Sequence, residues 1–199
     1  MQHEHGQHHD PDHAHERPHG RTHAHAHGAD GAGFVALGAA VLVVSDTRDL
    51  DTDASGKYLE QQLAAAGHRC VERRVVKDEI EAVRAAVAAW CQRDEVRVIL
   101  VTGGTGVTPR DVTPEALEPL FEKALPGFGE LFRQLSFQEI GSSAIQSRAT
   151  AGILRGRLVF ALPGSRGACR LALEQIILPQ LDARTLPCSF PTLLNWPPV

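Results

Sequence analysis

Residues 96–111 read Val-Arg-Val-Ile-Leu-Val-Thr-Gly-Gly-Thr-Gly-Val-Thr-Pro-Arg-Asp, an apolar run followed at once by a glycine-rich turn and a carboxylate. A short, continuous run rich in β-branched residues is typical of a strand buried on both faces of a parallel sheet. The glycines allow positive φ angles and bring backbone N–H groups close to a ligand. We therefore predict a strand over 96–102 whose carboxyl end opens into a ligand-facing loop.

Strand-like and helix-like segments alternate on both sides of this stretch. Apolar runs predict further strands at 39–44, 70–76 and 157–162. Apolar residues at helical spacing predict the intervening helices, over 58–67, 80–90, 127–135 and 167–177 and from Pro114, with Thr113 as N-cap of the last of these. This alternation implies crossover connections and a sheet covered on both faces. The predicted fold class is α/β: a three-layer α/β/α domain with a doubly wound, mainly parallel sheet.

Composition divides the chain into three parts. Residues 1–33 contain ten of the eleven histidines and almost no large apolar side chains, which predicts a disordered His-rich tail. Residues 34–190 are expected to form a single domain. Residues 191–199 are expected to be an extended, proline-rich end, since five prolines in the last 21 residues predict an extended arm.

Charge and hydropathy exclude several classes of function. The formal net charge of −4 is inconsistent with a basic surface for nucleic acid or an anionic membrane. No apolar run approaches the roughly 20 residues that span a bilayer, and no secretory signal begins the chain. The four cysteines are widely spaced, which favours reduced thiols rather than disulfides or a zinc site. We expect a soluble, cytoplasmic protein.

The glycine-rich loop is the strongest candidate for ligand binding. Its N–H groups form a concavity suited to phosphate, and Thr105 and Thr108 add hydroxyl donors. The spacing matches neither a Walker A motif nor the dinucleotide fingerprint, and a plain strand-to-helix turn is the alternative. Asp111 close by would repel phosphate unless a cation lies between them, which indicates Mg²⁺. Asp111 could otherwise cap a turn.

Ligands of doubly wound sheets bind beyond the carboxyl ends of the strands. This rule adds Ser45-Asp46, Lys77-Asp78 and Pro163-Gly164-Ser165 to the loop Gly103–Gly106. Asp78 also has the pattern of a helix N-cap, with Glu81 three residues later, and the pattern alone favours that role. Ser45 and Asp46 fit a ligand contact and a simple turn equally well.

Three further groups of polar residues are ambiguous. Glu130 and Arg133 are an i, i+3 pair that is either a surface ion pair or a polar ligand site. Ser143 and Arg148 form a polar patch in which Arg148 has the geometry to pair bidentately with phosphate. His68 is the only histidine after residue 33 and is assigned a structural role, so no Ser-His-Asp triad is available.

Considered together, these segments resemble the MoaB/Mog family of molybdenum cofactor biosynthesis proteins. The resemblance covers about residues 39–190. It rests on the order and spacing of Val-Ser45-Asp46, Asp51-Thr-Asp-Ala-Ser-Gly56, Thr-Gly-Gly-Thr-Gly106, Arg-Asp111-Val-Thr-Pro-Glu-Ala116, Pro-Gly-Phe-Gly-Glu130, Leu-Ser-Phe-Gln-Glu-Ile-Gly-Ser-Ser143, Ser-Arg148-Ala-Thr-Ala-Gly152 and Leu-Pro-Gly-Ser165. The closing segment 179–188 resembles the MoaB branch.

The resemblance implies molybdopterin adenylyltransferase chemistry, in which molybdopterin and Mg-ATP give adenylyl-molybdopterin and pyrophosphate. It implies homotrimers or homohexamers, with other proteins of the cofactor pathway as further partners. It assigns catalysis and Mg²⁺ to Asp78 and Asp111. The expected contacts to phosphate, nucleotide and molybdopterin are Ser45, Asp46, Gly103, Gly104, Thr105, Gly106, Thr108, Glu130, Arg133, Ser143, Arg148, Pro163, Gly164 and Ser165.

Two other functions remain open at this point. One is a non-catalytic molybdopterin-binding or scaffold protein of the same pathway. The other is metal handling through the tail, where His23, His25 and His27 are spaced to offer imidazole ligands to Ni²⁺, Zn²⁺ or Cu²⁺. A solvated tail without a metal role is the alternative.

Overall fold

The computed structural model describes residues 33–196. Predictions for the His-rich tail, including His23, His25 and His27, and for the last three residues lie outside the described part. Among the described residues, no helix is long and apolar enough to cross a membrane.

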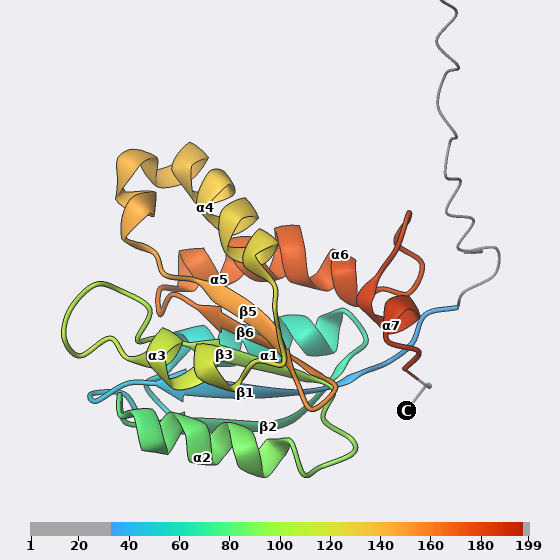
Figure 1. Cartoon of the computed structure of the whole chain (residues 1–199), viewed down its shortest axis with the longest axis horizontal. Coiled ribbons are helices and arrows are strands. Elements are labelled where there is room, and N and C mark those ends of the chain that lie inside the picture. The colour runs from blue at the N-terminus through green and yellow to red at the C-terminus, as the bar shows by residue number, and fades with distance from the viewer. Residues whose placement is uncertain (1–32, 197–199) are drawn as a thin grey trace, which may run out of the picture.

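A six-stranded sheet forms the centre of the domain, in the order β2-β1-β3-β6-β5-β4 (Figure 1). The strands are β1 (Gly38–Val44), β2 (Arg69–Val76), β3 (Val98–Thr102), β4 (Lys123–Ala124), β5 (Thr150–Leu154) and β6 (Arg157–Leu162). β1 pairs in parallel with β2 on one side and with β3 on the other, and β3 pairs in parallel with β6. β5 and β4 complete the sheet as an antiparallel edge.

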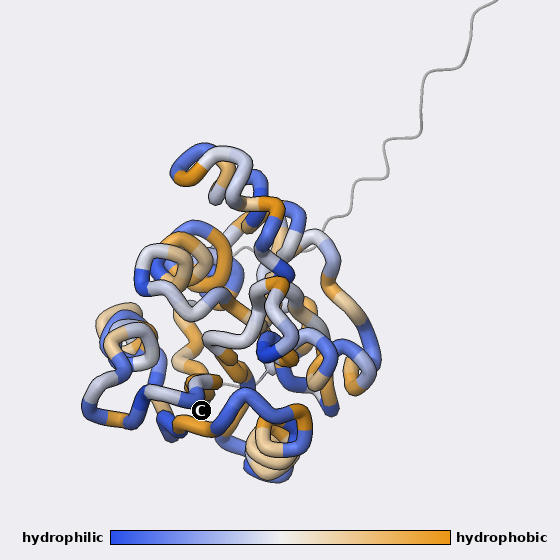
Figure 2. The backbone as a smooth tube through the Cα atoms, turned by 90° about the vertical axis from the view of Figure 1, so that its left-hand side faces the viewer, coloured by the Kyte–Doolittle hydropathy of each residue, from blue (hydrophilic) through white to orange (hydrophobic). Residues whose placement is uncertain are grey.

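Helices cover both faces of the sheet, which confirms the predicted three-layer α/β/α architecture. One face packs against α1 (Ala54–Ala65), α4 (Pro126–Ile140), α5 (Arg166–Ala172), the π-helical turn η3 (Leu173–Ile177) and α6 (Leu178–Leu181). The other packs against α2 (Ile80–Trp90) and α3 (Thr113–Leu117). All seven residues of β1 are buried, and those from Ala39 to Val44 alternate between the two cores. Figure 2 shows the hydrophobic segments gathered in the middle of the domain.

The order of the strands locates the ligand-binding edge. The chain passes from β1 outward to β2 and then returns to the other side of β1 to form β3. The direction of winding therefore reverses between β1 and β3, and ligands of such sheets bind at the carboxyl ends beside this point. Helix α4 and the 3₁₀ turn η2 (Gly141–Gln146) project beyond the rest of the domain in Figure 1.

Neither of the helix caps that the sequence pattern suggested is formed. Thr113 is the first residue of α3 rather than its cap, and its hydroxyl donates to the Gly103 carbonyl at 2.8 Å. Asp78 does not cap α2, because the N-cap residue is Glu79 and makes no side-chain capping bond. The side chains of Thr113 and Asp78 are directed to the glycine-rich loop instead, so a contact with that loop replaces the expected capping hydrogen bond.

The expected extended arm after residue 178 is also wrong in part. Residues Leu178–Leu181 continue the preceding helix as α6, and a short helix α7 (Phe190–Leu193) follows. Proline is tolerated in the first turn of a helix, where its missing N–H has no partner to lose. Pro191 occupies such a position in α7, whereas Pro179 comes just after the π-helical turn η3, where the regular α-helical bonding is already interrupted. The remaining short elements are the 3₁₀ turn η1 (Glu118–Leu120) and the strands β4 and β5, which were not predicted.

Candidate functional site

A cleft of about 400 Å³ opens at the carboxyl ends of β3 and β6. The glycine-rich loop forms one wall and the Pro163–Ser165 turn another. Helix α4 closes the cleft with Phe132, Ser136 and Ile140, and η2 adds Ser143 and Ala144. The predicted residues that line this cleft are Gly103, Gly104, Thr105, Gly106, Asp111, Ser143, Pro163, Gly164 and Ser165.

Two glycines of the loop adopt conformations that other residues rarely adopt. Gly103 and Gly104 have φ angles of 105° and 63°. A Cβ atom on Gly103 would lie 2.2 Å from the Val44 carbonyl oxygen at the end of β1. The loop therefore crosses directly over the neighbouring strand, and glycine is required there.

The backbone N–H groups of the loop are not equally available to a ligand. The N–H of Gly103 donates to the Leu162 carbonyl at 3.0 Å, which removes Gly103 from the predicted set of phosphate donors. Within residues 33–196, no hydrogen bond uses the N–H groups of Gly104 or Thr105. These two consecutive donors are the part of the loop that is free to bind an anion.

Asp78 and Asp111 both lie against glycines of this loop. A Cβ atom on Gly104 would lie 2.8 Å from Oδ1 of Asp78, and one on Gly106 would lie 2.8 Å from Oδ2 of Asp111. The glycines thus allow both carboxylates to approach the loop backbone. Although Asp78 and Asp111 come from different strand ends, the fold brings them to one place.

The two carboxylates differ in their pKa values. Burial raises the pKa of Asp78, the N–H of Val112 opposes this, and the negative charges of Asp111 and Asp46 add to the rise. Burial alone would raise the pKa of Asp111 as well. However, the hydroxyl and N–H of Thr108 donate to its Oδ2 at 2.6 and 2.8 Å and hold its pKa below the usual value. Asp78 is therefore the carboxylate that a cation would stabilise most.

Ser45 and Asp46 lie at the edge of this arrangement. The Ser45 hydroxyl accepts from the N–H groups of Thr47 and Arg48, which is the turn-forming role that the sequence left open. Asp46 pairs with Arg110, whose hydrogen bond lowers the pKa of the Asp46 carboxyl, and its Oδ1 accepts from the Asp78 N–H at 3.3 Å. Both residues line a separate, shallower depression of about 700 Å³ beside the cleft.

Arg148 fixes the backbone of the glycine-rich loop by hydrogen bonds to its carbonyl oxygens. Its Nε donates to the Gly106 carbonyl and one terminal nitrogen donates to the Asp111 carbonyl, both at 2.6 Å. Its other terminal nitrogen pairs with Glu115, and its backbone N–H donates to the Thr105 carbonyl at 3.0 Å. The guanidinium predicted to bind phosphate is thus engaged by the protein at all three nitrogens.

The Pro163–Ser165 turn closes the site from β6. The Ser165 hydroxyl accepts from the Ala168 N–H at 3.2 Å and caps α5. The Gly164 carbonyl accepts from the Ser55 hydroxyl at 2.9 Å and from Arg48 at 3.2 Å. These bonds join the segment after β1 to the turn after β6.

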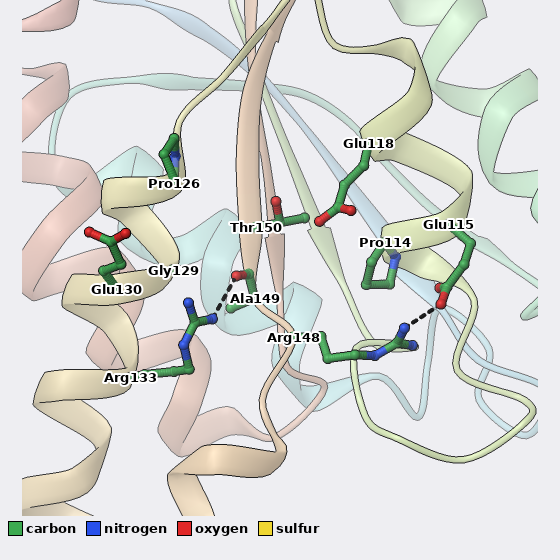
Figure 3. Close-up of a pocket in the computed structure, with 10 residues that line it drawn as sticks. All are labelled: Pro114, Glu115, Glu118, Pro126, Gly129, Glu130, Arg133, Arg148, Ala149 and Thr150. Atoms are coloured by element: carbon green, nitrogen blue, oxygen red, sulfur yellow. Dashed lines mark hydrogen bonds and ion pairs between the residues drawn. The ribbon is translucent and has the colours of Figure 1, made fainter.

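Glu130 and Arg133 do not line the loop cleft. They lie in a second pocket of about 400 Å³ under the first half of α4, together with Arg148 (Figure 3). No ion pair joins Glu130 to Arg133 in the described residues, and Arg133 donates instead to the carbonyls of Ser147 and Ala149. The pocket adds two acidic residues that the sequence analysis did not single out, Glu115 and Glu118. The only sequence signal for Glu118 is that it follows Glu115 by three residues in the helical segment that starts near Pro114.

The donors present fit Mg²⁺ that is shared with a phosphate ligand. Within the described part of the chain, no group of three or more histidine, cysteine, aspartate or glutamate side chains is preformed to hold a metal. Mg²⁺ commonly uses one or two carboxylates together with substrate phosphates. Asp78 and Asp111 beside two free N–H groups supply that combination.

Comparisons with known proteins show which family this chain resembles. Residues 40–183 match the family model described as "Probable molybdopterin binding domain". The chain is 53% identical over 157 residues to Molybdenum cofactor biosynthesis protein B of Escherichia coli K12, covering 79% of this chain and 92% of that one.

Solved structures have a similar fold. A crystal structure of Molybdenum cofactor biosynthesis protein B matches with a TM-score of 0.72 and 46% identity, over 73% of this chain and 91% of that one. The tungsten cofactor synthesizing protein MoaB from Pyrococcus furiosus matches with a TM-score of 0.64 and 37% identity, over 71% and 90% of the two chains.

Proposed function

The chain belongs to the molybdopterin-binding domain family of molybdenum cofactor biosynthesis proteins, and from that premise we propose that it transfers the adenylyl group of Mg-ATP to molybdopterin. The terminal phosphate oxygen of molybdopterin attacks the α-phosphorus of ATP. The bond from the α-phosphorus to the bridging oxygen breaks, and pyrophosphate leaves. The products are adenylyl-molybdopterin and pyrophosphate.

One observation carries this proposal. The loop has free N–H groups at Gly104 and Thr105, with Asp78 against Gly104 and Asp111 against Gly106, so phosphate donors and cation ligands belong to one short segment. Either feature alone is compatible with a plain turn. Together they match a site for a phosphate ligand that arrives with a divalent cation.

The chain's residues contribute mainly position and charge to such a reaction. Gly104 and Thr105 would hold a phosphate by their N–H groups, and Arg148 would keep the loop in place by its bonds to the carbonyls. Asp78 and Asp111 would hold Mg²⁺, which when bound neutralises phosphate charge. Phosphate transfer depends largely on positioning and charge, so neither a histidine nor a nucleophilic side chain is required.

We also propose that the protein is a homo-oligomer, a trimer or a hexamer. Helix α4 and η2 project from the domain and carry large apolar side chains, with Phe137 61%, Ile140 58% and Ile145 84% exposed. Apolar residues gathered on one projecting tip favour burial against another protein surface. Because the tip also closes the loop cleft, association of copies at the tip would affect the site.

Pyrophosphate release from the purified protein with molybdopterin and Mg-ATP tests the adenylyl transfer. We expect Asp111→Asn to reduce the rate at least a hundredfold while molybdopterin still binds. Asp94→Asn is the matched control, because that carboxylate is fully exposed on another edge of the domain. Molybdopterin binding without pyrophosphate release by the unaltered protein would instead support a scaffold role.

A further inference from the structure

Arg110 is a basic residue that lies among carboxylates at the carboxyl ends of the strands. It precedes Asp111 in the loop after β3, and its guanidinium pairs with Asp46 after β1. The Arg110 Nε donates to Oδ2 of Asp46 at 3.0 Å, and one terminal nitrogen donates to the same oxygen. The pair therefore joins the loop after β3 to the segment after β1.

Asp46 extends this connection to the third strand end. Its Oδ1 accepts from the backbone N–H of Asp78, which follows β2, at 3.3 Å. Because β1 lies between β2 and β3 in the sheet, the carboxylate of Asp46 joins the ends of three neighbouring strands. Both of its oxygens are engaged, Oδ2 by Arg110 and Oδ1 by the Asp78 backbone. Asp46 is thus a link between strand ends, and it holds Arg110 close to Asp78.

The charge of Arg110 also acts on Asp78. The hydrogen bond and charge of Asp46, followed by the charge of Asp78, raise the pKa of Arg110 and keep its guanidinium protonated. Burial is the main cause that raises the pKa of Asp78, and the positive charge of Arg110 acts in the opposite direction. Asp78, one of the two carboxylates to which Mg²⁺ is assigned, therefore has a counter-ion within the protein itself.

A guanidinium and a divalent cation beside the same carboxylates repel each other. The Arg110 side chain is 62% exposed, so water screens this repulsion and limits it to a small factor in affinity. A triphosphate reverses the sign, because Mg-ATP has a net negative charge that a guanidinium attracts. One residue thus opposes binding of the cation alone and favours binding of the cation with its phosphates.

We propose that Arg110 is a built-in counter-ion that couples divalent-cation binding to phosphate binding. It disfavours Mg²⁺ alone at Asp78 and Asp111 and favours Mg²⁺ that arrives with a triphosphate. The ion pair with Asp46 keeps the guanidinium where it has this effect. This inference rests on the proposed function for the assignment of Mg²⁺ to the two aspartates.

Calorimetric titrations of the full-length protein with Mn²⁺ alone and with Mg-ATP test this role. Mn²⁺ is the probe because it prefers oxygen ligands, as Mg²⁺ does. We expect Arg110→Gln to raise the affinity for Mn²⁺ about two- to fivefold and to lower the affinity for Mg-ATP by a similar factor. Arg110→Lys keeps the charge and should stay near the parent in both titrations. Lys57→Gln is the control, since it removes a positive charge from an exposed position on α1 and should change neither affinity.

Two further measurements separate the carboxylate site from other effects. The ten histidines of residues 1–33 offer imidazole ligands of their own, so part of the Mn²⁺ signal can come from them. In an Asp78→Asn background, Arg110→Gln should therefore give no gain in Mn²⁺ affinity. Raising the salt concentration from about 0.05 to 0.5 M should shrink both shifts, because salt screens exposed charges. Circular dichroism establishes that each variant is folded.

The outcomes separate this inference from adenylyl transfer. Equal Mn²⁺ affinities of the parent and Arg110→Gln, or no Mn²⁺ binding by either, overturn the counter-ion role. A fall in both affinities would show that Arg110 only stabilises the loop, and a gain that persists with Asp78→Asn would place the cation elsewhere. Both results also overturn it. If the two affinities shift in opposite directions but no pyrophosphate forms, adenylyl transfer fails while the counter-ion role stands.

Discussion

The Arg148 Nε donates a hydrogen bond of 2.6 Å to the carbonyl oxygen of Gly106. Together with its bond to the Asp111 carbonyl, this makes Arg148 a positioning residue for the loop. We predict that Arg148→Ala lowers adenylyl transfer at least tenfold and speeds amide hydrogen exchange over residues 103–111. Arg148→Lys should recover part of both, because lysine can replace one of the two bonds but lacks the planar fork of arginine.

Hydrogen exchange monitored by mass spectrometry gives a readout of the loop that does not depend on activity. The control is Arg170→Lys, since Arg170 forms a surface ion pair with Glu139 at 3.0 Å. Such exposed pairs contribute little, so neither exchange over the loop nor activity should change. An Arg148→Ala variant with normal loop protection but lost phosphate binding would show that Arg148 contacts the ligand instead.

Asp78 should destabilise the folded protein at neutral pH. Burial raises its pKa above the ordinary value of 3.8, and the neighbouring carboxylates Asp111 and Asp46 add to this. A carboxyl group whose pKa is higher in the folded than in the unfolded protein favours folding at pH values below its unfolded-state pKa. This contribution to stability is lost as the pH rises through the folded-state pKa. Asp78→Asn should therefore raise the melting temperature at pH 7, and the gain should shrink as the pH falls toward 3.8.

The same substitution should abolish adenylyl transfer, because a neutral amide is a poor Mg²⁺ ligand. Thermal melts and pyrophosphate assays of one protein preparation measure both effects. A variant that is both less stable than the parent at pH 7 and fully active would contradict the electrostatic and the functional assignment of Asp78. Asp94→Asn should change neither quantity, since that carboxylate is fully exposed.

The sequence predicted the parallel part of the fold because its strands are short apolar runs with a recognisable pattern. β4 and β5 were missed for a physical reason. β4 has only two residues, and β5 reads Thr-Ala-Gly-Ile-Leu, with a glycine at its centre. That glycine is required by the fold, as a Cβ atom on Gly152 would lie 2.3 Å from the ring of Phe121. The β4–β5 edge of the sheet is defined by tertiary packing, which cannot be recognised from a local sequence pattern.

The candidate site was predictable at the level of strand ends but not of individual contacts. The rule for doubly wound sheets grouped Asp46, Asp78 and the loop correctly in one region. It did not show that Asp78 turns from the helix toward Gly104, or that the Gly103 N–H is already used. Nor did it show that Arg148 binds carbonyl groups. Each of these depends on which neighbours the folded chain brings within hydrogen-bond distance.

The projecting tip gives a prediction about assembly. If Ile145 is buried between copies, Ile145→Asp should shift the protein to monomers in sedimentation experiments, because a carboxylate in an apolar interface loses its hydration. Leu193→Asp is the control: Leu193 is 53% exposed on α7, and its variant should keep the parental oligomer. A monomeric parent at micromolar concentration would refute the proposed trimer or hexamer.

Gly104 and Gly156 provide a matched pair for testing the loop itself. Both have positive φ, 63° and 72°, so alanine strains the backbone at either position by a similar amount, about 1 kcal/mol. Only at Gly104 would the new Cβ meet functional groups, the Asp78 carboxylate at 2.8 Å and the Thr113 hydroxyl at 2.5 Å. At Gly156 nothing lies within 4 Å.

We therefore predict that Gly104→Ala loses more stability than Gly156→Ala, and that only Gly104→Ala loses affinity for Mg-ATP, by at least tenfold. Calorimetric titration with Mg-ATP measures the affinity, and thermal melts measure the stability. Because the backbone strain is shared, a difference between the two variants reports the displacement of Asp78 and Thr113. Equal Mg-ATP affinities of the Gly104→Ala and Gly156→Ala variants would show that the nucleotide does not bind next to Gly104 and Asp78.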